Sequence, residues 1–388
     1  MRVLHTGDWH LGRQIRGLSR QAEFESVLEE IVSIATAEAV DVFVVAGDIF
    51  DTFSPPTDAE RLLYETLTRL LSEGVQVVLV AGNHDHAGRM DALAGILKLA
   101  GIHCVGSVPA AAGEPIHLRS RDGETALTVI ALPWVPERKT FDVESLGGPI
   151  EGPIQQYAAK LEQALRHFWQ PAAREPLNLF VGHMLVDGAV VSENGGERRL
   201  HIGQSFAVPA QALPPAQYVA LGHVHRHQRL GAASPAYYSG SILQLDFGEA
   251  GQEKYVNLVD LQPSLPATVS KIALQSGRRL RSESLRLDEL DAAAARFGDD
   301  YLRVTVELEG PLSSLYQQVR ERLPNAVEVT PRYPEQQELL VAAEQQSGLS
   351  PEELFGRYYR QRYGIEVTAE LVKAFSELHA EALANAAP

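Results

Sequence analysis

The sequence lacks the paired cysteines of disulfide-bonded secreted proteins and the long apolar runs of membrane-embedded proteins. It contains one cysteine, Cys104, among 388 residues, so an internal disulfide and a zinc cluster of thiolates are both excluded. No stretch approaches the about 20 apolar residues that a membrane-spanning helix needs, and the first residues, Met1 to Asp8, become polar too early for a signal peptide. We therefore expect a globular protein of the reducing cytoplasm.

An excess of basic charge is also missing. The chain has 34 Lys and Arg residues against 50 Asp and Glu residues, a net charge of -16, which argues against a protein that coats nucleic acid by bulk electrostatics. Two modest basic islands remain, one within the first twenty residues and one over residues 271–286. At roughly one domain per 150 residues, the length predicts two or three domains.

The first part of the chain predicts strands that alternate with helices. Short apolar runs at 2–6, 42–46, 75–81, 177–181 and 218–221 are typical of buried strands, and helical apolar spacing occupies 24–34 and 57–71. The pattern predicts an α/β domain. The carboxyl ends of strands in such sheets are where ligand sites gather.

A proline-containing connector at 261–266 separates a second region. There, 269–274 and 302–307 predict strands and 287–297 and 312–323 predict helices, which together indicate a small α+β domain. After a break at 331–334, the sequence Ser350-Pro351-Glu352-Glu353 is a typical helix start. The predicted domains are therefore 1–260, 267–332 and a C-terminal helical segment at 335–388.

Each predicted strand of the first domain ends in glycine followed by polar side chains. The clusters are Gly7-Asp8-Trp9-His10, Gly47-Asp48-Ile49-Phe50-Asp51, Gly82-Asn83-His84-Asp85, Gly182-His183 and Gly222-His223-Val224-His225. Their oxygen and nitrogen donors, without thiolate, suit Mn, Fe or Zn, and seven donors are too many for one ion. A single histidine in such a turn is usually structural, but five clusters together favour a pair of metals, the arrangement used for displacement at phosphorus, with Asp48 as the bridging carboxylate.

These clusters resemble the five motifs of the calcineurin-like metallophosphoesterases. Within that superfamily the chain resembles the SbcD family of bacterial nuclease subunits, related to the meiotic-recombination nuclease of eukaryotes and archaea. The more specific stretches are His5-Thr6-Gly7-Asp8-Trp9-His10-Leu11-Gly12, Gly47 to Thr52, His183 to Ala189 and Tyr238-Ser239-Gly240-Ser241. The resemblance implies an α/β fold: a metallophosphoesterase β-sandwich flanked by helices, with a small α+β capping domain and a C-terminal helical tail.

The resemblance also implies roles for the site residues. It implies two divalent ions, with manganese the metal that such nucleases favour. One ion is held by Asp8, His10 and His225, the other by Asn83, His183 and His223, and Asp48 bridges them. His84 is implied to orient the phosphate and assist the leaving oxygen, as a catalytic residue that does not ligate metal. Archaeal and eukaryotic relatives have histidine in place of Asp51, so Asp51 either orients His84 or another ligand, or simply starts the turn that follows.

Arginines near the first metal motif are candidate DNA contacts. Arg13, Arg16 and Arg20 follow that motif in a glycine-containing loop, and contact with phosphate and simple solvation are both open. For Arg198, Arg199 and the basic residues of 271–286, a solvated surface is favoured.

The C-terminal segment presents apolar residues at helical spacing, namely Leu354, Phe355, Tyr358, Tyr359, Leu371, Phe375 and Leu378. They either pack back on the second domain or dock on a partner. The resemblance implies the second, with the coiled coil of an SbcC-like ATPase as the partner. It also implies a homodimer within a heterotetramer, through the helices that carry Leu63 to Leu71 and Met90 to Leu97, although periodicity alone predicts that these residues face the core.

The function implied by the resemblance is a metal-dependent DNA nuclease within a larger complex. It would be a 3′ to 5′ exonuclease on duplex ends and an endonuclease on single strands and hairpins, in repair, recombination and replication of the nucleoid in the cytoplasm. The sequence has no Gly-x-x-x-x-Gly-Lys-Ser/Thr loop, so ATP is expected to be used by the partner. Alternatives are a phosphoesterase for nucleotides or phosphoproteins, and a non-catalytic scaffold, which should have lost ligands that are all present here.

Overall fold

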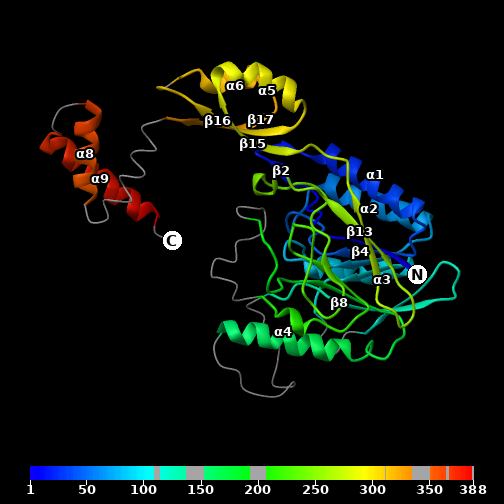
Figure 1. Cartoon of the computed structure of the whole chain (residues 1–388). Coiled ribbons are helices and arrows are strands. Elements are labelled where there is room, and N and C mark those ends of the chain that lie inside the picture. The colour runs from blue at the N-terminus through cyan, green and yellow to red at the C-terminus, as the bar shows by residue number, and fades with distance from the viewer. Residues whose placement is uncertain are drawn as a thin grey trace.

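Two six-stranded sheets form the body of the molecule (Figure 1). The computed structural model describes residues 1–108, 114–136, 153–192, 207–310, 312–333, 350–363 and 367–386. In spatial order, the first sheet contains β14 (Thr268–Ala273), β13 (Tyr255–Asp260), β1 (Arg2–Thr6), β4 (Val42–Ala46), β5 (Gln76–Val80) and β6 (Ile102–Val105). The second contains β11 (Gln228–Arg229), β12 (Ala236–Tyr238), β10 (Tyr218–Gly222), β9 (Asn178–His183), β8 (Ala126–Leu132) and β7 (Ile116–Arg119).

The strands that carry the polar clusters run parallel. β1, β4, β5 and β6 are parallel in the first sheet, and β8, β9 and β10 are parallel in the second. A short hairpin of β2 (Gln14–Ile15) and β3 (Leu18–Ser19) follows the first cluster. Because parallel strands present their carboxyl ends at one edge, the polar turns of each sheet open on the same side.

Strand alternation builds a layered core. Val42, Val44 and Ala46 of β4 face the second sheet, whereas Phe43 and Val45 face the helices on the other side. These helices are α1 (Gln21–Ala37), α2 (Thr57–Ser72) and α3 (Ala87–Leu99), while α4 (Pro153–Trp169) covers the outer face of the second sheet. Burying each large apolar side chain stabilises the fold by about 1.5–3 kcal/mol. The strands are apolar on both faces because one face packs against the other sheet and the opposite face packs against helices.

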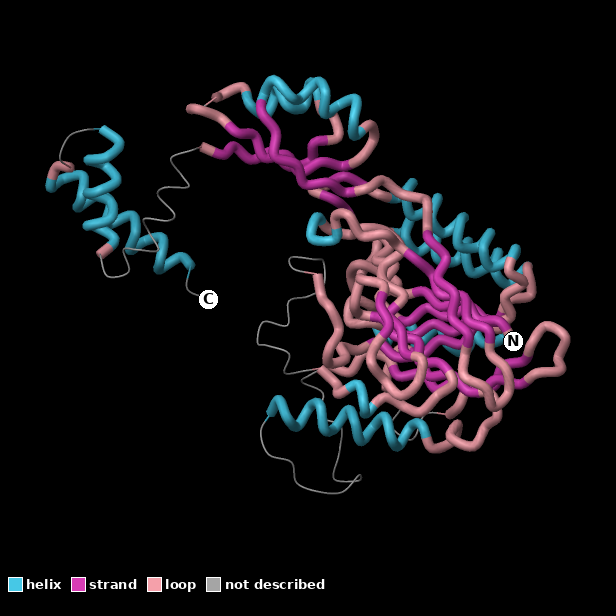
Figure 2. The backbone as a smooth tube through the Cα atoms, in the orientation of Figure 1, coloured by secondary structure: helices cyan, strands magenta, loops and turns pink. Residues whose placement is uncertain are grey.

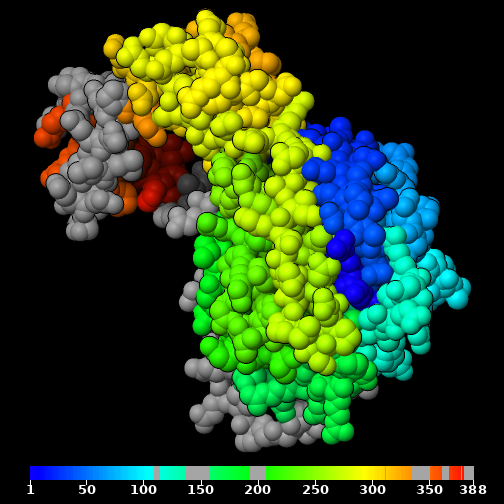
Figure 3. All heavy atoms as spheres, turned by 45° about the vertical axis from the view of Figure 1, so that its right-hand side comes forward, coloured from blue at the N-terminus to red at the C-terminus, as the bar shows by residue number. Residues whose placement is uncertain are grey.

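A smaller lobe, here called the cap, lies beyond the sandwich; it is the yellow lobe at the top of Figure 3. Its three parallel strands are β15 (Leu280–Arg286), β16 (Tyr301–Glu307) and β17 (Ala326–Arg332). The crossovers are η5 (Leu287–Glu289) with α5 (Leu290–Phe297), and α6 (Leu315–Arg322). Figure 2 shows these helices together on one face of the cap sheet.

The predicted α/β class and β-sandwich are confirmed, with one strand assigned to the wrong domain. The run at 269–274 was expected in the second domain, but β14 pairs antiparallel with β13, with Asp260 opposite Thr268. The stretch 261–267 is therefore a hairpin loop inside the body. Its two prolines led to the prediction of an interdomain linker, because prolines are common both in linkers and in turns between strands.

The C-terminal helices α8 (Pro351–Tyr363) and α9 (Ala369–Ala386) form a pair that Figure 1 shows apart from the cap. The predicted start of α8 is confirmed, since Ser350 Oγ accepts from Glu353 N at 3.2 Å and Glu353 accepts from Ser350 N at 2.8 Å. The rings of Phe355 and Phe375 stack with centroids 4.4 Å apart. Within the described ranges, none of the helices combines the length and apolar character needed to cross a membrane.

Candidate metal centre

The five polar clusters meet between the two sheets. The turns after β1, β4 and β5 face those after β9 and β10, and backbone bonds join neighbouring turns, such as Asp8 N to the Gly47 carbonyl at 2.9 Å and His10 N to the Asp48 carbonyl at 3.0 Å. All seven predicted ligands are buried, with exposures from 0% for Asp8 to 7% for Asn83. The structure therefore brings together every residue of the predicted ligand set.

Two glycines are required by how closely these turns approach. A Cβ atom on Gly47, whose φ is +93°, would overlap the imidazole of His183, and one on Gly222 would overlap the carbonyl oxygen of Ala46. Several non-glycine residues of the site also have positive φ, namely Asp8 at 50°, His10 at 50°, Asp48 at 49° and His223 at 106°. Such conformations cost about 1–3 kcal/mol each and cluster at functional sites, where the surrounding fold holds them.

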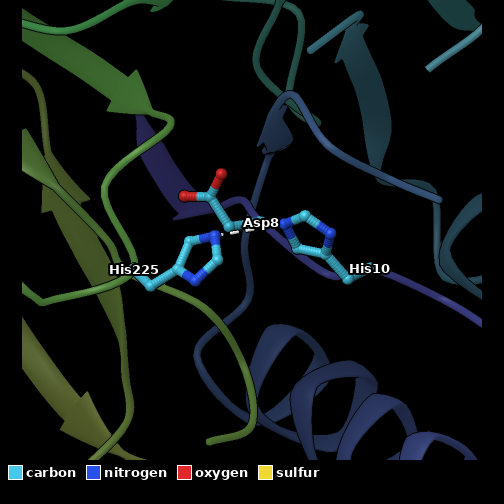
Figure 4. A group of neighbouring side chains, drawn as sticks. All are labelled: Asp8, His10 and His225. Atoms are coloured by element: carbon cyan, nitrogen blue, oxygen red, sulfur yellow. Dashed lines mark hydrogen bonds between the residues drawn. The ribbon is translucent and has the colours of Figure 1, made fainter. Parts of the chain in front are cut away.

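The first group of donors consists of Asp8, His10 and His225 (Figure 4). The Nε2 atoms of His10 and His225 face each other at 3.2 Å. The opposite ring nitrogens face carboxylates: His225 Nδ1 lies 2.8 Å from Glu249, and His10 Nδ1 lies 3.3 Å from Asp51. With the protons on both Nδ1 atoms, two lone pairs point at each other, an arrangement that a bound cation satisfies.

The second group consists of Asn83, His183 and His223. Asn83 Oδ1 lies 3.2 Å from His183 Nε2 and 3.0 Å from His223 Nδ1. His183 Nδ1 is 2.8 Å from the Ala46 carbonyl and donates to it, which leaves Nε2 for the site. The ring of Trp134 stacks on His223, with centroids 5.0 Å apart.

Asp48 lies between the two groups. Its Oδ2 atom is 3.5 Å from His10 Nε2 on one side and 3.5 Å from His183 Nε2 on the other. Burial opposes its ionisation, yet His183 and His10 hold the pKa of Asp48 well below its usual value. Burial alone would lower the pKa of His183, but the carboxylates of Asp48 and Asp8 raise it to about 9. The site therefore favours positive charge at its centre.

His84 lies at the edge of this centre and is only partly buried. Its backbone N donates to Asp48 Oδ1 at 2.8 Å, and its Nδ1 atom donates to the carbonyl oxygen of Asp51 at 2.8 Å. The side chain of Asp51 points elsewhere, toward His10 and toward Arg13, which lies 3.1 Å away. Asp51 therefore contacts His84 through its backbone carbonyl and His10 through its carboxylate.

The three candidate DNA contacts have different surroundings. Arg13 pairs with Asp51, and Arg16 pairs with Glu328 of the cap at 2.6 Å. Arg20 is buried: its guanidinium pairs with Glu23 and donates to the Gln244 carbonyl. The predicted place of Arg20 at the rim is wrong, because helix α1 begins at the next residue and turns this side chain into the protein.

Two buried carboxylates were missed by the sequence interpretation. Asp85 accepts from the backbone N atoms of Gly82, Ile49 and Phe50 at 2.8, 3.1 and 2.9 Å, and so ties the turn after β4 to the turn after β5. Glu249, in η4 (Phe247–Glu249), contacts His225. The cluster Gly82-Asn83-His84-Asp85 contained a signal for the first, but nothing near Glu249 in the sequence pointed to the site.

The remaining predicted residues lie away from the centre. Arg198 and Arg199 lie outside the described residues. On α2 and α3, Leu63 and Leu67 are buried in the core, whereas Ile96 is exposed. The C-terminal residues Leu354, Tyr358, Leu371 and Leu378 are exposed, and Phe355, Tyr359 and Phe375 are partly buried.

The donor set fits two divalent cations. Seven buried nitrogen and oxygen donors converge, none is a thiolate, and Asp48 stands between two groups of three, as a bridging carboxylate would. The metal that such a site takes is a hard or borderline divalent ion.

Comparisons with known proteins agree with this geometry. Residues 1–227 match the family described as calcineurin-like phosphoesterase, and residues 276–363 match the family described as type 5 capsule protein repressor C-terminal domain. The SbcD component of the SbcCD nuclease of Bacillus subtilis is 34% identical over 97% of each chain, and that of Escherichia coli K12 is 31% identical over 92% of each. The Rhodobacter capsulatus protein of the same name is 36% identical over 67% of this chain and 66% of its own. The chain belongs to the calcineurin-like phosphoesterase family and, within it, to the group of SbcD nuclease subunits.

Proposed function

We propose that this protein is the nuclease subunit of an SbcCD-like complex and hydrolyses DNA phosphodiesters at a site for two divalent metals, with Mn²⁺ as the expected ion. The observation that carries the proposal is the position of Asp48 Oδ2, 3.5 Å from a histidine of each donor group. Asp8, His10 and His225 would hold one ion, and Asn83, His183 and His223 the other. When bound, the ions would supply charge for the phosphate oxygens and activate the attacking water.

The protein's own residues would prepare this reaction. The carbonyl of Asp51 fixes the ring of His84 through Nδ1. When the ring carries a second proton as imidazolium, Nε2 would give that proton to the leaving oxygen, and the ring would return to the neutral form with its proton on Nδ1. The side chain of Arg13 is one-quarter exposed and lies next to Asp51, which supports the proposal that it contacts a phosphate of the DNA. The buried turns hold the ligands before substrate arrives, so little reorganisation is needed at the moment of reaction.

The proposed polarity and assembly rest on the family resemblance of the sequence motifs. We infer 3′ to 5′ exonuclease activity on duplex ends and endonuclease activity on hairpins, on chromosomal DNA in the cytoplasm, with ATP hydrolysed by the partner. The exposed apolar residues of α8 and α9 support docking on an SbcC-like coiled coil. Ile96 and Leu99 of α3, exposed by 70% and 90%, support a homodimer.

Cleavage of labelled DNA tests the proposal. Duplexes with 3′ or 5′ labels and a hairpin are incubated with the full chain and Mn²⁺, Mg²⁺ or EDTA, with and without an SbcC-like ATPase and ATP. We expect Mn²⁺-dependent cutting that His84→Ala abolishes while metal content stays at two ions. His117→Ala, on the exposed face of the edge strand β7, is the matched control and should cut normally.

The same experiment separates the alternatives. Hydrolysis of an aryl phosphodiester or a nucleotide without any DNA cleavage, even with the partner present, would assign the site to a small-substrate phosphoesterase. A chain that binds no metal and cleaves neither substrate would be a scaffold.

A further inference from the structure

Glu249 is a buried carboxylate that contacts one of the proposed metal ligands. Its side chain is 0% exposed, and its Oε1 atom lies 2.8 Å from Nδ1 of His225. We propose that Glu249 is a positioning residue that fixes the tautomer and the ring orientation of His225, and thereby the affinity of one of the two metal sites. This inference rests on the proposed function only in taking His225 as a metal ligand.

The contact determines which nitrogen of His225 faces the site. A carboxylate can only accept a hydrogen bond, so the imidazole places its proton on Nδ1 and presents the Nε2 lone pair on the opposite side. That Nε2 atom is the one 3.2 Å from Nε2 of His10. Carboxylates that accept from a ligating histidine orient the ring and increase its basicity as a ligand.

Glu249 is itself held in one orientation by donors on its other oxygen. Oε2 accepts from Lys254 Nζ at 2.6 Å and from the backbone N of Leu245 at 3.2 Å. Ser241 Oγ also lies 3.2 Å from Oε2, but its hydroxyl is closer to the Leu243 carbonyl, at 2.8 Å. Lys254 also donates to the carbonyl of His225 at 3.0 Å. The two oxygens thus have separate tasks: Oε2 is fixed by Lys254 and Leu245 N, and Oε1 contacts His225.

The second donor group is built differently. The Nδ1 atom of His183 donates to a backbone carbonyl, that of Ala46, which a side-chain substitution cannot remove. Changes at Glu249 are therefore expected to affect the site of Asp8, His10 and His225 and to spare the other. This asymmetry gives the experiment an internal reference.

The division of tasks makes Glu249→Gln a sharp test. Gln has the same shape as Glu, but only its oxygen can accept the hydrogen bonds from Lys254 Nζ and Leu245 N. Its NH₂ group must therefore face Nδ1 of His225. An NH₂ donor there forces the proton of His225 onto Nε2 and removes the lone pair from the site. Glu253→Gln is the matched control, because it makes the same chemical change at an exposed glutamate of the same segment.

Two measurements on the full chain read the result. Nitrogen-15 NMR of the histidine rings in metal-free protein, with His225 identified through His225→Asn, reports the tautomer directly. Mn²⁺ titration by calorimetry, together with electron paramagnetic resonance, reports how many ions bind and whether they form a coupled pair. Near-ultraviolet circular dichroism checks that each variant is folded.

We expect His225 to carry its proton on Nδ1 in the wild type and in Glu253→Gln, and on Nε2 in Glu249→Gln. We expect Glu249→Gln to bind one Mn²⁺ about 10–100-fold more weakly and the other normally, with loss of the coupled signal. Glu253→Gln should bind two ions with affinities near those of the wild type. An Nε2 proton in the wild type, or unchanged affinities in folded Glu249→Gln, would overturn the inference. A wild type that binds no Mn²⁺ would refute the proposed function instead, and the tautomer measurement would still decide the role of Glu249.

Discussion

The burial of Arg20 leads to a prediction that separates a structural from a DNA-binding role. Its side chain is 0% exposed and that of Glu23 is 10% exposed. The guanidinium forms two bonds with the Glu23 carboxylate, of 3.1 and 2.8 Å, and Glu23 also accepts from the backbone N of Arg278 at 2.9 Å. The pair therefore connects the start of α1 to the segment that leads into the cap.

The substitution Arg20→Met is expected to lower the free energy of unfolding by about 3–5 kcal/mol, since it leaves Glu23 buried without a compensating charge. The double substitution Arg20→Met with Glu23→Gln should recover part of this loss, because it removes that charge and keeps an acceptor for Arg278 N. Burial raises the pKa of Glu23, but Arg20 outweighs it and holds the pKa below its usual value of 4.5. The pair therefore contributes stability above about pH 4.5 and loses it as the pH falls further.

Urea unfolding at pH 7, followed by far-ultraviolet circular dichroism, measures these differences. Arg16→Met is the control, because Arg16 is 50% exposed and the loss of a surface pair should cost no more than about 1 kcal/mol. If Arg20→Met unfolds within about 1 kcal/mol of the wild type and instead weakens DNA binding, Arg20 lies at the rim of the site and the structural reasoning is refuted.

Three further predictions concern the metal centre. A metal binds neutral imidazole, and the pKa of His183 is raised to about 9. The affinity for Mn²⁺ should therefore increase about tenfold per pH unit from pH 7 to 9. Calorimetry that shows the same Mn²⁺ affinity at every pH would contradict this. Asp85→Ala leaves the N–H groups of Ile49, Phe50 and Gly82 without their acceptor. At about 1–3 kcal/mol for each lost acceptor, urea unfolding should show a loss of stability of at least about 3 kcal/mol. A loss below about 1 kcal/mol would show that Asp85 does not hold the two turns together. Mn²⁺ at a hundred times its dissociation constant should stabilise the folded chain by about 2.7 kcal/mol, which is measured as a higher melting temperature that EDTA reverses. Identical melting curves with and without Mn²⁺ would show that Mn²⁺ does not bind the folded state.

The sequence by itself determined the strands that carry the polar turns, the first two helices and the candidate set of donors. Local signals sufficed because each ligand-bearing turn directly follows an apolar run and begins with glycine, as in Gly47-Asp48. The glycines are required by close approach, as at Gly47, where a side chain would overlap His183. The start of α8 at Ser350 was predictable for the same local reason.

Only the tertiary structure decided the features that depend on distant segments. Arg20 follows a surface loop in sequence, yet the fold turns it onto Gln244, which lies 224 positions away. β14 follows a proline-containing loop typical of linkers, and only its pairing with β13 places it in the body. Glu249 looks like an ordinary surface glutamate until the fold buries it against His225 and Lys254. A buried charge is stable only beside its partners, and those partners are brought together by the sheets rather than by neighbouring positions in the chain.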